Sequence, residues 1–305
     1  MTRENWENKT FHPADILLKH WQTITERYGQ KKYLSISSLP EIDNAIWGLK
    51  RKSMVVIAGR PGMGKSSLML QMAYDFALQG RTVYYFSLEM GKEECLERLI
   101  CNYCNIDNYN IHTGKVNVNI CMDKVAELYE TLNQIKLVII ESWGRTFAEI
   151  LEIMDNFEKP DAIFLDYINL IRQGSLSKKD AIDEYIKDVR TLALDKNFCA
   201  ILGAQINRDV HRNQDPTAEV PIPNMWNIKE TGNVEEHSDL ILITHWPHYY
   251  RFNEKGDISD EKEYIIKVAK NRSGRTGIFV CDFLPQFYRI TSREKATKLA
   301  DKRND

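Results

Sequence analysis

Gly59-Arg-Pro-Gly-Met-Gly-Lys65-Ser66 is the stretch that decides the fold of this chain. It fits the pattern G-x-x-x-x-G-K-[ST], and it stands between an apolar run of strand type at 54–58 and a segment of helix-forming composition at 67–78. A glycine loop in this setting binds phosphate, because backbone N–H groups and the positive end of the helix dipole surround the anion. The alternative is a glycine-rich turn that holds no ligand. The motif and its context favour a nucleoside triphosphate site.

In that site each residue type has a separate task. Lys65 reaches the β- and γ-phosphates, and the Ser66 hydroxyl binds Mg²⁺. The residues expected to hold ATP are Gly59, Arg60, Pro61, Gly62, Met63, Gly64, Lys65, Ser66 and Ser67.

Composition is ordinary for a globular enzyme. The chain has 305 residues, 43% hydrophobic and 28% charged, with a formal net charge of −2. No apolar run approaches the roughly 20 residues that span a bilayer, and the N-terminus has no apolar signal-peptide stretch, so we expect a cytoplasmic protein without a membrane partner. A net charge near zero does not advertise nucleic acid, although a ring can confine its basic residues to a channel.

Six cysteines are scattered along the chain, which is typical of reduced thiols. Cys101, Cys104, His112 and Cys121 offer ligand types that bind zinc, but their spacing is loose and two of them fall in an expected helix at 93–105. We interpret these cysteines as small buried residues, with a zinc site as the alternative.

Apolar runs alternate with amphipathic segments over most of the chain, which indicates a parallel sheet covered by helices on both faces. The fold class is therefore α/β, with a hairpin of two further strands expected at the edge of the sheet. The expected strands are 54–58, 83–87, 136–140, 162–165, 199–203, 240–244, 263–269 and 277–283, and the expected helices include 67–78, 93–105, 125–133, 147–157 and 181–195. Segments 172–179 and 208–227 look irregular.

Three polar residues follow apolar strands, where a triphosphatase needs them. Asp166 closes Ile163-Phe-Leu-Asp166, the form of a Walker B strand that holds Mg²⁺ through its water ligands. Glu89 follows the strand at 83–87 and is placed to orient and deprotonate the attacking water; the alternative is a surface glutamate that starts the next helix. Gln205 ends the strand Ile201-Leu-Gly-Ala-Gln205, where an amide can sense the γ-phosphate.

Together these blocks resemble the DnaB family of replicative helicases over roughly residues 36 to 290. Ser-Leu-Glu-Met after a P-loop is the most selective piece. The matching blocks are Ala58-Gly-Arg-Pro-Gly-Met-Gly-Lys-Ser66, Ser87-Leu-Glu-Met90, Phe164-Leu-Asp-Tyr-Ile-Asn-Leu-Ile171, Ala204-Gln-Ile-Asn-Arg208, Ile111-His-Thr-Gly114, Lys229-Glu-Thr-Gly232, Val234-Glu-Glu-His-Ser-Asp239 and Lys270-Asn-Arg-Ser-Gly274 with Gly277.

The resemblance implies a RecA-like motor that assembles as a homo-oligomer, a hexameric ring, and moves 5′ to 3′ on single-stranded DNA. ATP then lies between subunits, and Lys270 and Arg272 would serve the neighbour's phosphates. Without the family match, these two residues would be read as a basic turn facing solvent. A RecA-like ATPase that forms a filament or acts as a switch is the alternative function.

For DNA, the resemblance points to the block Lys229, Glu230, Thr231 and Gly232 as a channel loop that grips phosphates without reading bases. A second channel loop is expected near residues 175–179. Its lysines, Lys178 and Lys179, have a solvated surface as the alternative interpretation. Lys229 stands where the family usually has arginine, which keeps the charge but loses the bidentate fork.

The expected domains are an N-terminal extension at 1–35, the motor at 36–291 and a charged tail at 292–305. The extension contains an amphipathic helix at 13–28, marked by Ile16, Leu17, Ile24 and Tyr28, which resembles the family's linker helix and would contact a neighbouring subunit. Fewer than forty residues precede the motor, where cellular members of the family carry an N-terminal collar domain; the collar is either naturally absent or trimmed from this sequence. A primase or a helicase loader is the further partner that the resemblance implies.

Overall fold

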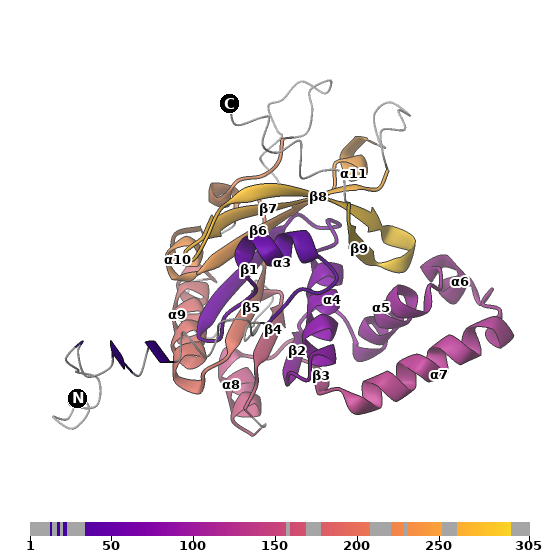
Figure 1. The fold of residues 1–305 in the computed structure, drawn as a ribbon, viewed down its shortest axis with the longest axis horizontal. Coiled ribbons are helices and arrows are strands. Elements are labelled where there is room, and N and C mark those ends of the chain that lie inside the picture. Colours follow the sequence, from indigo (N-terminus) through magenta and orange to yellow (C-terminus); the bar gives the residue numbers. More distant parts are fainter. Residues whose placement is uncertain are drawn as a thin grey trace.

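The computed structural model describes residues 13, 17–18, 21–22, 34–156, 159–168, 178–207, 221–228, 231–251 and 261–293. Nine strands form one sheet in the order β3-β2-β4-β5-β1-β6-β7-β8-β9 (Figure 1). The strands are β1 Ser53–Gly59, β2 Val83–Ser87, β3 Leu137–Glu141, β4 Ala162–Asp166, β5 Cys199–Gln205, β6 Leu240–His245, β7 Glu263–Asn271, β8 Gly277–Leu284 and β9 Arg289–Ser292. β1 to β6 pair in parallel with one another, and β7, β8 and β9 continue the sheet in antiparallel fashion.

Helices cover both faces of the parallel part (Figure 1). α3, α4, α5 and α7 contribute to the hydrophobic core on one face, and α8, α9 and α10 to the core on the other. The helices are α3 Pro40–Ile46, α4 Lys65–Leu78, α5 Lys92–Cys104, α6 Asn108–Thr113, α7 Val118–Gln134, α8 Phe147–Asp155, α9 Lys178–Lys196, α10 Thr231–His237 and α11 His248–Arg251, with 3₁₀ turns η3 Met225–Asn227 and η4 Pro285–Phe287. This is the α/β fold, a parallel sheet with helices on both faces, that the apolar runs predict, and it fits the RecA-like class that the family resemblance implies.

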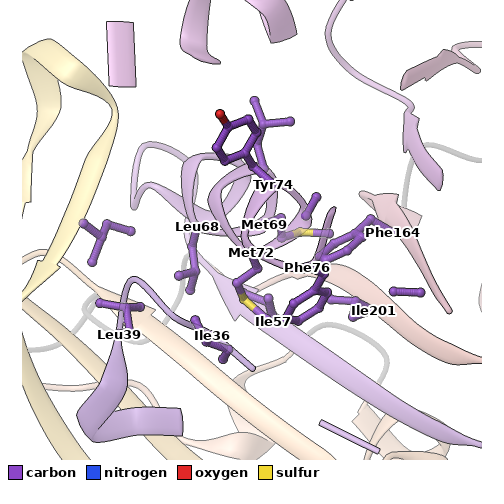
Figure 2. Packing of buried hydrophobic residues seen from close by; sticks show 14 of the residues in the cluster. Ile36, Leu39, Ile57, Leu68, Met69, Met72, Tyr74, Phe76, Phe164 and Ile201 are labelled. Atoms are coloured by element: carbon purple, nitrogen blue, oxygen red, sulfur yellow. The ribbon is translucent and has the colours of Figure 1, made fainter. Parts of the chain in front are cut away.

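Burial explains why the central strands are apolar throughout. Every residue of β1, β2, β4 and β6 is buried, since both faces of the sheet are covered. On the α4 face, Met72 and Phe76 pack on Ile57, and the Phe76 ring lies 5.9 Å from that of Phe164 (Figure 2). α4 is therefore held firmly behind the loop that precedes it.

The antiparallel end of the sheet differs from the prediction. The expected hairpin, β7 and β8, is not at the edge, because β9 pairs outside β8 and buries Ile290. β9 was missed because only one of its four residues is apolar, too few for an alternating pattern. Ser292 belongs to β9, so the sheet takes in the first residue of the predicted tail. Arg293, just after the strand, forms an ion pair with Asp282 of β8; 294–305 lie outside the described residues.

Lys178 and Lys179, expected near a channel loop, are placed in a helix, and their contact with DNA stays a prediction. Both lie in the first turn of α9. The sequence pattern places the start of this helix too late, at 181. The first residues of α9 are polar, so the apolar periodicity begins only at the first core residue, Ile182. Residues 169–177 lie outside the described residues.

Five residues of the expected N-terminal helix are described, and all five are helical: Pro13, Leu17, Leu18, Trp21 and Gln22. The side chains of Leu17, Leu18 and Trp21 are 60–74% exposed. Ile16, Ile24 and Tyr28 lie outside the described residues. Across the described parts of the chain, every helix is too short or too polar to cross a membrane.

The cysteines are free thiols, and most are buried. Cys101 and Cys104 are each 1% exposed, and burial raises the pKa of Cys101 to about 11. The interpretation as small buried side chains is confirmed for Cys101 and Cys104, whereas Cys121 is only partly buried. Within the described ranges, no His, Cys, Asp and Glu side chains cluster as a metal-binding group.

Candidate active site

The expected nucleotide-binding residues meet at the carboxyl edge of the parallel strands. Gly59 at the end of β1 is flanked in register by Gln205 of β5 and Thr244 of β6. Two strands further along, Asp166 at the end of β4 pairs with Ser87 at the end of β2. Ligands of open α/β sheets bind at this edge, so the fold brings the separate sequence blocks to one place.

The glycines of the loop have distinct structural reasons. Gly62 and Gly64 have φ angles of +78° and +65°, which residues with a side chain rarely adopt. Gly59 has no such angle, but a Cβ there would lie 2.3 Å from Oγ1 of Thr244. The first glycine is thus required by the close approach of β6, and the other two by the path of the loop.

The loop then leads into α4 with its first turn open to an anion. Gly64 caps the helix without a side-chain hydrogen bond, and no acidic residue occupies the first turn. The first backbone N–H groups of a helix have no partner within it, and they carry the positive end of its dipole. Lys65 and Ser66 are half-buried in this turn, so the local structure suits phosphate.

Met63 anchors the loop from behind. It is 1% exposed, and its carbonyl accepts a 2.7 Å hydrogen bond from the Tyr264 hydroxyl of β7. The backbone N–H of Trp246 lies 3.3 Å from the Met63 sulfur, and Phe283 of β8 lies beside Gly64. The antiparallel strands therefore buttress the P-loop.

Three charged groups interact beside the loop. Burial lowers the pKa of Lys65, whereas the carboxylates of Asp166 and Glu89 act in the opposite direction. Burial, and then the charge of Asp166, raises the pKa of Glu89. Nζ of Lys65 lies 4.1 Å from the ring centroid of Tyr167, a cation–π contact.

Asp166 has the features of a ligand residue. It is 1% exposed, and its Oδ2 accepts a 2.6 Å hydrogen bond from the Tyr85 hydroxyl. Its other oxygen, Oδ1, is buried and has no hydrogen-bond partner among the described residues. A buried carboxylate oxygen without a donor is costly unless something else compensates its charge. Asp166 and the Ser66 hydroxyl are oxygen donors of the kind that Mg²⁺ prefers, so the residues fit this metal.

Lys270 and Arg272 lie at the opposite end of the strands, near the amino ends of the parallel strands. β7 runs antiparallel to β6, so its last residue, Asn271, pairs with Leu240 at the start of β6. Nη1 of Arg272 is 3.3 Å from Oδ1 of Asp239, and Arg272 and Lys270 also donate to backbone carbonyls near the end of α10. The structure does not bring these two residues to the P-loop of the same chain.

The residues expected to contact DNA are only partly described. Lys229 and Glu230 lie outside the described residues, and Thr231 begins α10. A Cβ at Gly232 would meet nothing within 4 Å. Ile228, just before this block, pairs with Ile206 beyond the end of β5, which places it at the carboxyl edge of the sheet. For Lys178 and Lys179 the backbone alone is described, in α9.

Sequence reasoning missed the side chains that support the site from neighbouring strands: Tyr85, Tyr167, Thr244, Met63 as an anchor, and Tyr264. One signal was present. Tyr85 and Tyr264 are hydroxyl-bearing residues within expected strands, and a buried tyrosine usually finds a hydrogen-bond partner for its hydroxyl.

Comparison with known proteins agrees with this geometry. The family described as DnaB-like helicase C terminal domain matches residues 36–292. The replicative DNA helicase DnaC of Bacillus subtilis (strain 168) is 26% identical over 295 residues, which cover 92% of this chain and 62% of that protein. The replicative DNA helicase DnaB of Helicobacter pylori (strain ATCC 700392 / 26695) is 25% identical over 318 residues, which cover 90% and 63%. The chain thus spans less than two thirds of these relatives.

Two solved structures share the fold. The ATPase domain of G40P superposes with a TM-score of 0.80 at 21% identity, covering 93% of this chain and 99% of that one. A DnaB-like replicative helicase, described with its interactions with primase, gives a TM-score of 0.77 at 22% identity and covers 93% and 67%.

Proposed function

Because the chain belongs to the DnaB-like helicase C-terminal domain family, we propose that it is an ATP-driven motor that moves on single-stranded DNA and unwinds duplex DNA. The single observation that carries this proposal is the meeting of Lys65, Asp166 and Glu89 at the mouth of a P-loop. The relatives are named replicative helicases, and their names support the DNA substrate.

In this proposal the loop and the start of α4 hold the phosphates of ATP, and Lys65 leaves the Tyr167 ring to contact the β- and γ-phosphates. Ser66 and Asp166 hold Mg²⁺, which neutralises phosphate charge when it is bound. Glu89 orients and deprotonates the attacking water, a task that its raised pKa suits. Gln205, beside Gly59, senses the γ-phosphate from the end of β5.

The position of Arg272 supports assembly as a ring, which we propose to be a homohexamer. Arg272 and Lys270 lie at the edge opposite their own P-loop, so they are placed to serve the site of a neighbouring subunit. A head-to-tail contact of this kind gives a ring where its rotation closes and an open filament where it does not, and we propose the closed ring. A guanidinium supplied in trans stabilises charge on the transferring phosphoryl group.

A second subunit contact is proposed for the N-terminal helix, whose Leu17 and Trp21 are exposed on the described chain. On α7, Val118, Met122 and Tyr129 are 58–63% exposed. Their spacing of four and seven residues places them on one side of that helix. We propose that the helix of one subunit covers this surface on the next.

Single-stranded DNA is proposed to follow Lys229, Glu230, Thr231 and Gly232 in the central channel, with the start of α9 nearby as a second contact. Backbone and lysine contacts to phosphate would make binding tolerant of sequence and sensitive to salt. Since one structural relative is described with its primase, a primase or a helicase loader is a further proposed partner.

The test is ATP hydrolysis with and without single-stranded DNA, together with separation of a forked duplex and the mass of the assembly in solution. Stimulation by DNA, strand separation and a large ring are expected. Hydrolysis that DNA stimulates without any strand separation would replace the helicase by the alternative, a RecA-like filament, mediator or switch. Absence of ATP-dependent activity in a correctly assembled ring would refute both.

A further inference from the structure

Asp166 is held by a side chain from the neighbouring strand. β2 and β4 pair in parallel with Tyr85 opposite Phe164, so Tyr85 lies one pleat before Asp166 on the same face of the sheet. The tyrosine is long enough to cover that offset. Its hydroxyl donates to Oδ2 of Asp166 at 2.6 Å, the short distance typical of a hydrogen bond to a carboxylate.

Packing gives the Tyr85 ring a fixed position. Tyr85 is fully buried, and its ring stacks at 5.8 Å on that of Phe164, which in turn packs on Phe76 of α4. The ring has no space in which to turn away, because the core is closely packed around it. The hydroxyl is therefore presented to Asp166 in one direction.

The two carboxylate oxygens of Asp166 consequently differ. Oδ2 is occupied by Tyr85, whereas Oδ1 is buried without a hydrogen-bond partner among the described residues. We propose that Tyr85 is a positioning residue of the magnesium site: its hydroxyl fixes the rotation of the Asp166 carboxylate so that Oδ1 is directed to the ligands of the metal. This rests on the proposed nucleotide site. Residues that hold a metal ligand in place typically change metal affinity 10- to 100-fold when they are removed.

The experiment compares Tyr85→Phe with Tyr84→Phe as a matched control. Tyr84 is a buried tyrosine on the same strand, but it belongs to the core on the opposite face of the sheet. The readout is the affinity for fluorescent mant-ADP, measured with Mg²⁺ and with chelator, so that the ratio reports the metal alone. Mn²⁺ bound in the presence of ADP, measured by electron paramagnetic resonance, gives a second readout that is independent of activity.

We expect Tyr85→Phe to lower the magnesium-dependent gain in mant-ADP affinity by about tenfold, with the metal-free affinity unchanged. Tyr84→Phe should behave as the wild type. In an Asp166→Asn background, Tyr85→Phe should have no further effect, because the residue acts only through that carboxylate. The proposal would be overturned if Tyr85→Phe and Tyr84→Phe showed the same magnesium-dependent gain in mant-ADP affinity. It would also be overturned if Tyr85→Phe lowered that gain as much in the Asp166→Asn background as in the wild type.

Folding is checked by circular dichroism and thermal melting. If Tyr85→Phe does not fold because it leaves a buried charge without a donor, the double variant Tyr85→Phe/Asp166→Asn should fold, since the amide carries no charge. A double variant that also fails would show that Tyr85 serves packing alone and would overturn the proposal. Wild-type protein that binds mant-ADP without any effect of Mg²⁺ would refute the proposed nucleotide chemistry as well, so the two failures can be told apart.

Discussion

The variant Arg272→Ala keeps a complete P-loop but has no guanidinium to donate to a neighbouring subunit. The variant Lys65→Ala keeps the guanidinium but has a defective P-loop. The sheet sets the distance between these two positions. Arg272 is bonded to the backbone of Asp239, which is bonded to Met54 at the start of β1. Gly59 lies five residues further along the strand, at about 3.3 Å each, and two strand spacings of about 4.8 Å across the sheet. Because these two directions are perpendicular, the straight distance between the two positions is roughly 19 Å. No side chain at one edge serves the site at the other.

Each variant alone should lose most ATP hydrolysis. Arg272→Ala lacks a trans arginine, which contributes about 10³-fold or more to the rate, and Lys65→Ala lacks the lysine that contacts the β- and γ-phosphates. In rings assembled from equal amounts of the two, an intact site forms where an Arg272→Ala subunit receives the guanidinium of a Lys65→Ala neighbour. With random assembly and independent sites, about one site in four is intact, so the mixture should recover roughly a quarter of wild-type activity.

The assay mixes the two variants after dissociation, reassembles the rings and measures steady-state hydrolysis with single-stranded DNA. Native mass spectrometry confirms that the rings are mixed. The control mixes Arg272→Ala with the double variant Lys65→Ala/Arg272→Ala, which supplies no guanidinium and should give no recovery. Mixed rings without recovery, or an Arg272→Ala protein that is fully active alone, would refute the reasoning. Loss of the exposed pair with Asp239 should leave folding intact.

Three further substitutions test the site. Glu89 acts as a base only when it is deprotonated, and its pKa is raised above the ordinary 4.5, so the acid limb of kcat/KM should lie above that value and be absent in a slow Glu89→Gln variant; a limb at or below 4.5 would contradict this. Tyr264→Phe leaves the Met63 carbonyl without its buried donor and should lower the free energy of unfolding by about 1–2 kcal/mol in urea denaturation. An unchanged free energy of unfolding would show that this hydrogen bond does not stabilise the P-loop. Gly59→Ala places a Cβ 2.3 Å from Oγ1 of Thr244, so it should lower the melting temperature, and adding Thr244→Ala should restore most of it; no rescue would mean that another contact requires the glycine.

Much of the fold could be predicted because the central strands are apolar on both faces. The expected strand at 54–58 and the observed β1 Ser53–Gly59 differ by one residue at each end, as the buried run is bounded by a polar residue and by the loop glycines. β9 Arg289–Ser292 could not be predicted in this way. A four-residue edge strand with one buried side chain is specified by pairing with β8, which local sequence does not reveal.

The site shows the same division between local and distant information. Residues that end a strand, such as Asp166 and Gln205, could be identified because a polar residue after an apolar run lies at the carboxyl edge. Tyr85 and Tyr264 could not, since their partners are 81 and 201 residues away in sequence. Their roles depend on which strands are neighbours and in what register, and no pattern within one strand contains that information.

Sheet order also relates each site to the next. β7 begins beside the P-loop, where Tyr264 donates to the loop backbone, and carries Lys270 next to its last residue, Asn271, at the other end. It lies between β6 and β8 with a ladder on either side, so its two ends are parts of one paired strand. If Lys270 serves a neighbouring subunit, the strand that supports one nucleotide site also carries a residue of the next. The nucleotide sites of adjacent subunits are then linked through one continuous, paired strand, with no intervening loop.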